Sequence, residues 1–103
     1  MLVQRRYNRE NAVQYARTWA LSRNPLFYNY TGQGGDCTNF VSQAVLAGSC
    51  QMNYTPTFGW YYIDSEMRTA SWTGVEFFYN FITYIRNHLT YIINICWVIH
   101  FKY

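Results

Sequence analysis

A cysteine stands where a helix is expected to begin, directly after two glycines and an aspartate. Residues 34–37 read Gly-Gly-Asp-Cys, and the apolar spacing that follows predicts a helix from Cys37 to Ala47. Asp36 is a typical N-cap residue, which would make Cys37 the first residue of the helix. At that position the unpaired amides and the positive end of the helix dipole favour the thiolate, the nucleophilic form of cysteine. The expected chemistry is attack on a carbonyl carbon, with first-turn amides stabilising the oxyanion.

The same placement also fits an unreactive cysteine, because buried thiols are common in protein cores and are usually inert. A nucleophile needs a base, and the chain offers two histidines. His88 lies late in a predicted helix, whereas His100 lies in an apolar run that favours a strand. A lone histidine at either place is more often a surface residue or a satisfied core residue than a base.

Other kinds of site find little support in the sequence. The three cysteines, Cys37, Cys50 and Cys96, include no C-x-x-C pair, which argues against structural zinc, and no cofactor is expected. The glycine loop before Cys37 lacks the lysine of a phosphate loop and the spacing of a dinucleotide fingerprint. Three arginines cluster near the N-terminus but begin no basic stripe, so a nucleic-acid partner is not expected.

Composition favours one small packed domain. The chain has 103 residues, of which 50% are hydrophobic, 21% aromatic and 13% charged, with a net charge of +3. Such a chain is too apolar for disorder. The longest apolar run, residues 91–101, is shorter than the roughly 20 residues of a membrane span, so a membrane anchor is not expected. No secretory signal is predicted, and the compartment is left open.

Three helices are expected to position the cysteine. The first runs from Asn8, its N-cap, to Arg23, where Asn24-Pro25 stops it. Its predicted inward face holds Ala12, Val13, Ala16, Trp19, Ala20 and Arg23. The second runs from Cys37 to Ala47, with Gly48 as the residue that ends it. Its predicted inward face holds Phe40, Val41, Ala44, Val45 and Gly48, and its polar residues Asn39, Ser42 and Gln43 are interpreted as structural.

The third helix is expected from Trp72 to about His88, capped by Ser71. Its predicted inward face holds Val75, Phe78, Tyr79, Ile82 and Ile85. Residues 49–71 are expected to form a long, partly extended loop, and residues 91–101 a buried strand. Four aromatic residues of this half fit either a substrate groove or the core, with the core favoured by the area that they bury: Trp60, Tyr61, Tyr62 and Trp72.

Four stretches in this order resemble the putative amidase domain family: YNRENAVQYARTWALSRNP, GGDCTNFVSQAVLAG, GWYY and SWTGVEFFYNF. That family is related to the papain-like cell-wall hydrolases, including the bacterial CHAP amidases. The resemblance covers residues 7–81, which are predicted to be the N-terminal part of an amidase domain. Residues 82–103 are predicted to be a divergent apolar tail.

The resemblance implies an α+β, papain-like fold, with a helical first half followed by an antiparallel sheet. This chain would supply the helices and one strand. The family's nucleophile matches Cys37, and its neighbouring aspartate matches Asp36. A histidine would take the thiol proton, a third polar residue would orient it, and a thioester would form and hydrolyse. The implied substrate is a peptide or amide, with peptidoglycan suggested by analogy.

The family pattern fades after Phe81. The expected Gly-Asp turn and histidine-serine pair are absent, and neither His88 nor His100 matches the family's motif. Because the resemblance implies a base on a strand that packs against the cysteine helix, His100 is the candidate base. The tail is rich in isoleucine and tyrosine and lacks glycine, proline, alanine, serine and acids, a bias typical of AT-rich DNA read out of frame. We therefore expect a thiol-dependent amidase or peptidase domain that is truncated and self-associates through exposed apolar surface, with its activity left open. The alternative is a non-catalytic remnant or binding module of the same fold.

Overall fold

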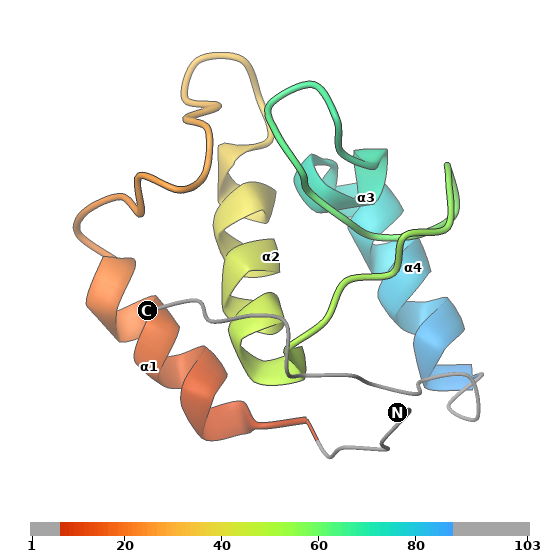
Figure 1. Ribbon diagram of the computed structural model, residues 1–103, viewed down its shortest axis with the longest axis horizontal. Coiled ribbons are helices and arrows are strands. Elements are labelled where there is room, and N and C mark those ends of the chain that lie inside the picture. Colours follow the sequence, from red (N-terminus) through yellow and green to blue (C-terminus); the bar gives the residue numbers. More distant parts are fainter. Residues whose placement is uncertain (1–6, 88–103) are drawn as a thin grey trace.

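Helix α2 (Asp36–Ser49) lies between α1 (Arg9–Trp19) on one side and α3 (Ala70–Thr73) and α4 (Val75–Asn87) on the other (Figure 1). α1 packs along α2, α3 packs against α2, and α3 leads directly into α4. The structure is a computed structural model that describes residues 7–87, with side chains described for residues 7–83. α2, the helix that carries the cysteine, is therefore held from two sides.

Little β structure accompanies these helices. Across residues 7–87 the β pairing consists of two isolated antiparallel bridges, Asn53 with Trp60 and Tyr62 with Arg68. Both bridges join residues within the loop between α2 and α3 and so hold its two halves together. This mostly helical part is compatible with the helical half of an α+β domain. The papain-like arrangement stays a prediction, and the strand expected at residues 91–101 lies outside the described residues.

The start of α1 confirms the predicted cap, because the Asn8 side chain accepts the Asn11 N–H at 3.0 Å. The helix ends at Trp19, four residues earlier than predicted, and Arg23 lies in the loop that follows. The predicted inward face was partly wrong. Tyr15 is its buried residue, whereas Val13 is exposed. A tyrosine can enter this interface because its hydroxyl bonds to buried polar groups, which apolar periodicity does not register.

α2 turns a mainly polar face to the interior. Its buried residues are Thr38, Asn39, Ser42, Gln43, Leu46, Ala47 and Gly48, and the predicted inward residue Val41 is exposed. Gly48 lies inside the helix rather than beyond it, because Cys50 ends the helix in a left-handed conformation and donates its N–H to the Leu46 carbonyl at 2.7 Å. The structural interpretation of Asn39, Ser42 and Gln43 is confirmed by their bonds to neighbouring elements.

The single helix predicted after Ser71 is two helices that meet at Gly74, whose φ of −105° and ψ of 119° are extended. Ser71 does not cap a helix. It lies inside α3, where its hydroxyl donates to the Gly59 carbonyl at 2.7 Å. The inward face is also corrected, since Phe78 and Phe81 pack on the core. Three predicted inward residues are exposed instead: Val75, Tyr79 and Ile82.

Trp72 is the centre of an aromatic core. Its side chain is fully buried, and its ring centroid lies 4.9 Å from that of Trp60 and 5.7 Å from that of Tyr62. Phe27 stacks on it at 5.9 Å. The core interpretation of Trp60, Tyr62 and Trp72 is therefore confirmed, whereas half-buried Tyr61 stacks on exposed Tyr54.

Polar side chains of α2 form hydrogen bonds with the buried polar groups of this core. The Trp72 indole N–H donates to Asn39 Oδ1 at 2.9 Å, and Asn39 Nδ2 donates to the Tyr28 carbonyl at 3.0 Å. Ser42 donates to the Trp72 carbonyl at 2.9 Å and accepts from the Trp60 indole N–H at 3.1 Å. Each of these groups would lose free energy if it were buried unpaired. The polar face of α2 thus exists because the indoles packed against it need acceptors.

Replacing Asn39 with alanine should strongly destabilise the fold. The Asn39→Ala variant leaves the Trp72 indole N–H and the Tyr28 carbonyl without these partners, which should lower the free energy of unfolding by about 3 kcal/mol. Urea denaturation at constant slope measures the change. Asn80→Ala, the same exchange at an exposed position of α4, should change stability by less than about 0.5 kcal/mol. Equal losses in both variants would refute the role given to Asn39.

Candidate functional site

Cys37 is the second residue of α2, and its side chain is exposed and free. The helix begins one residue earlier than predicted. Gly35 is the N-cap, with a φ of 92°, and Asp36 is the first helical residue. The predicted capping role of Asp36 is therefore corrected. Its carboxylate turns toward the preceding loop, because a guanidinium and a loop amide there offer it stronger partners than the helix amides.

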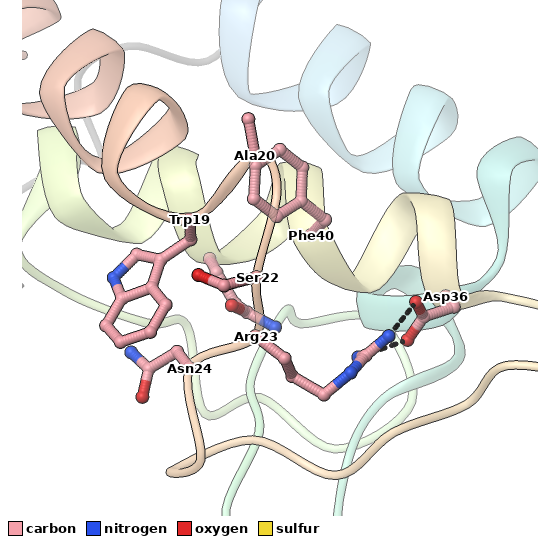
Figure 2. Close-up of a pocket in the computed structure, with 8 residues that line it drawn as sticks. Trp19, Ala20, Ser22, Arg23, Asn24, Asp36 and Phe40 are labelled. Atoms are coloured by element: carbon pink, nitrogen blue, oxygen red, sulfur yellow. Dashed lines mark hydrogen bonds and ion pairs between the residues drawn. The ribbon is translucent and has the colours of Figure 1, made fainter.

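Asp36 is the most heavily bonded side chain at the start of α2. Arg23 Nη1 donates to its Oδ1 at 3.0 Å and Nη2 to its Oδ2 at 2.9 Å (Figure 2), and the Tyr30 N–H donates to Oδ1 at 3.0 Å. Asn39 Nδ2 and the Thr31 hydroxyl lie at 3.4 Å. The bonds from Arg23, followed by the Tyr30 amide, lower the pKa of Asp36 to about 2, against an opposing effect of partial burial.

Gly35 brings the start of α2 against the end of α3. A Cβ atom at Gly35 would lie 2.6 Å from the Thr73 carbonyl oxygen and 2.9 Å from the Thr73 Cβ. Its φ of 92° is also one that residues with side chains rarely adopt. Gly35 is therefore required for two reasons: its positive φ, and its close contact with Thr73, which holds the start of α2, and with it Cys37, against α3.

The face of α2 that carries Cys37 is open. Val41 lies one turn after Cys37 and is 44% exposed, and Ala44 on the same side is half-buried. Neither α1 nor α3 covers the cysteine. A substrate can therefore reach the sulfur, and the first-turn amides beside it have no acceptor within the helix.

A cavity of about 150 Å³ lies next to this turn, between the end of α1 and α2 (Figure 2). Its lining combines aromatic and polar side chains: Trp19, Ala20, Ser22, Arg23, Asn24, Asp36, Phe40 and Gln43. Cys37 does not line it, but Asp36 precedes the cysteine and Phe40 follows it by three residues. The cavity therefore adjoins the first turn of α2 and can receive a small polar group.

The candidate base, His100, lies outside the described residues, as do His88 and Cys96. The structure therefore gives no distance between His100 and Cys37. Residues 7–83 contain no histidine. In this part of the chain no three metal-binding side chains gather, and none of the described helices is long and apolar enough to cross a bilayer. Arg23 was not predicted as a partner of Asp36. The Asn24-Pro25 stop was the available signal, because it frees the preceding residue from the helix.

Comparison with known proteins gives one family. The model of the putative amidase domain matches residues 6–93. The uncharacterised protein YhbB of Bacillus subtilis strain 168 is 38% identical over 69 residues, which are 65% of this chain and 20% of that protein. The chain thus spans about a fifth of that relative's length. No solved structure matches it.

Alanine at Gly35 should cost more than alanine at Gly34. Both glycines have positive φ, 92° and 81°, so both exchanges carry backbone strain of about 1 kcal/mol. Only Gly35→Ala also meets Thr73, since nothing lies within 4 Å of a Cβ at Gly34. We expect Gly35→Ala to lower the free energy of unfolding by at least about 1 kcal/mol more than Gly34→Ala, measured by urea denaturation. Equal effects would contradict the close packing of α2 on α3.

Acid should weaken the contribution of Asp36 to stability. The pKa of Asp36 is lowered from 3.8 to about 2 in the folded chain, so its contribution is present above pH 3.8 and is lost as the pH falls toward 2. Asp36→Asn should therefore be less stable than the wild type at pH 7, and the difference should shrink as the pH falls to 2. Denaturant titrations across this range measure it. Glu66→Gln, which removes an exposed carboxylate, is the control.

Proposed function

Because the chain belongs to the putative amidase domain family, we propose that it carries a thiol-dependent amidase or peptidase site whose nucleophile is Cys37. The single observation that supports this most is the position of Cys37, which is exposed in the first turn of α2 and lies inside the matched region. An inert core cysteine would be buried. Here the side chain is open to a substrate and next to unpaired amides.

The proposed reaction follows from this geometry. The Cys37 thiolate attacks the carbonyl carbon of an amide, and the amides of the first turn stabilise the negative oxygen that forms. Collapse of this intermediate breaks the C–N bond, expels the amine with a proton from the base, and leaves a thioester on Cys37. Water, deprotonated by the same base, then attacks the thioester and releases the acid and the thiol.

The base of this reaction is not among residues 7–83, which have no histidine. In the papain-like arrangement that we propose, a sheet packs against the cysteine helix and presents the histidine. The open face of α2 at Cys37 and Val41 is where such a sheet would fit. His100 is the base that this chain itself offers, although it does not match the family's motif.

The proposed substrate is a peptide or amide bond, with peptidoglycan as the favoured source. The cavity beside Asp36 and Phe40 has room for a small polar group of such a substrate. The support for peptidoglycan is analogy with related cell-wall hydrolases.

A second function is favoured because residues 7–83 hold no histidine and neither His88 nor His100 matches the family's motif. It is a non-catalytic module that binds a wall peptide with the same surface. The exposed apolar residues of α4, among them Val75 and Tyr79, would then serve contact with a partner or with a second copy of the chain. The two functions differ in what Cys37 must do, since only catalysis needs its sulfur.

Removing the sulfur should abolish amide hydrolysis. Cys37→Ala should lower turnover of a peptide anilide or of soluble peptidoglycan fragments by at least about 10³-fold, because the members of such a site act as a unit. Release of the amine measures turnover, and the stability of the variant should stay near that of the wild type because the side chain is exposed. Gln14→Ala, at an exposed position of α1, is the control.

The outcomes separate the two functions. Turnover by the wild type that Cys37→Ala loses and Gln14→Ala keeps would support the amidase. No turnover by the wild type, together with equal binding of peptidoglycan fragments by wild type and Cys37→Ala, would support the binding module.

A further inference from the structure

We propose that Arg23 is a positioning residue for Cys37, which balances the carboxylate next to the cysteine and holds the first turn of α2 in place. The inference deepens the proposed function and rests on it for its catalytic meaning. The contacts that support it concern Asp36, which lies between the arginine and the cysteine.

Asp36, the residue before Cys37, has two opposite electrostatic effects. A carboxylate at the first position of a helix stabilises the helix start, because it lies at the positive end of the dipole. The same charge opposes a second negative charge on the neighbouring sulfur. Asp36 therefore helps the helix and, if left unbalanced, works against a thiolate at Cys37.

Arg23 meets Asp36 in the geometry that best cancels its charge. Two parallel bonds of 3.0 and 2.9 Å join the two guanidinium nitrogens to the two carboxylate oxygens. Nη2 also donates to the Thr31 hydroxyl at 3.1 Å, so the arginine is fixed from a third direction. Such paired bonds fix the orientation of the carboxylate and also neutralise its charge. A lysine could supply the charge but not the paired geometry.

No cation other than Arg23 bonds Asp36 among residues 7–83. Asp36 is the only charged residue of α2, and the loop of residues 24–35 has none. The elements packed against α2 and the loops joined to them carry further charged or titratable groups, among them Arg9, Glu10 and Arg17 of α1, and Tyr28, Tyr30, Arg68 and Glu76. Arg68 lies over the Tyr30 ring, 4.8 Å from its centroid, and the Arg23–Asp36 pair is the ion pair seen among residues 7–83.

The place of Arg23 in the chain makes it a link between elements. It follows α1, reaches across the loop and bonds the first residue of α2. It also lines the cavity together with Asp36 (Figure 2). A substrate group that enters this cavity would therefore meet a neutral pair rather than a free carboxylate.

The test compares how readily Cys37 is alkylated in two variants that lose the same bonds. Arg23→Gln leaves Asp36 charged and unbalanced, whereas Arg23→Gln combined with Asp36→Asn removes both charges. The full chain is treated with iodoacetamide, a neutral reagent, from pH 5 to pH 10. Peptide-resolved mass spectrometry follows Cys37 separately from Cys50 and Cys96.

We expect Arg23→Gln to move the pH midpoint of Cys37 alkylation upward by about one unit, and the double variant to return close to the wild type. Arg23→Lys should stay nearer to the wild type than Arg23→Gln does, because it keeps the charge while losing the paired geometry. Arg17→Gln, an equal charge change in the last turn of α1, should have no effect.

Identical profiles for Arg23→Gln and the double variant would overturn the proposal, because a purely structural arginine would affect both alike. An upward shift of about one unit in Arg23→Lys relative to the wild type would overturn it as well. This comparison does not need the glutamine variants, so it keeps the test valid if they fold poorly. Amide turnover is measured in parallel. Its absence in the wild type would remove the proposed function while leaving the comparison of alkylation profiles intact.

Discussion

The structure depends on one constraint: two buried indoles must find hydrogen-bond acceptors inside the core. Trp72 and Trp60 find them on α2, at Asn39 and Ser42. A helix that supplies these acceptors must turn a polar face inward, and α2 does so over most of its length. The direction of that face fixes the rotation of the helix, and the rotation decides that Cys37 is exposed.

The hydrogen bonds that satisfy the indoles also connect the core to the candidate site, through Asn39 and Asp36. Asn39 bonds the Trp72 indole and the Tyr28 carbonyl, and its Nδ2 lies 3.4 Å from Asp36. Asp36 in turn gathers Arg23 and the Tyr30 amide. The loop between α1 and α2 is therefore bonded to the first turn of α2 at Arg23 and at Tyr30, and the cysteine lies in that turn.

Sequence patterns predicted the parts that follow local rules. The sequence predicted the Asn8 cap and the existence of α1 and α2, because capping and apolar periodicity depend on nearby residues. It also predicted the burial of Trp60 and Trp72, because large aromatic side chains gain much free energy on burial. The inward faces were harder, since apolar periodicity assigns buried tyrosine, asparagine and serine to the surface. Arg23 was missed as a site residue because its partner lies 13 positions away across a loop. The break at Gly74 was missed because glycine is tolerated in a first turn, and only the packing of α3 shows that a second helix starts there.

The contact between Trp60 and Trp72 gives the molecule a built-in spectroscopic reporter. Two indoles with centroids 4.9 Å apart and fixed by hydrogen bonds on both rings lie in a chiral, rigid environment. Their near-ultraviolet circular dichroism reports tertiary packing, whereas helix content is seen separately in the far ultraviolet. A state that keeps its helices while the indoles lose their fixed orientation would therefore be visible as such, without a label and in the unmodified chain.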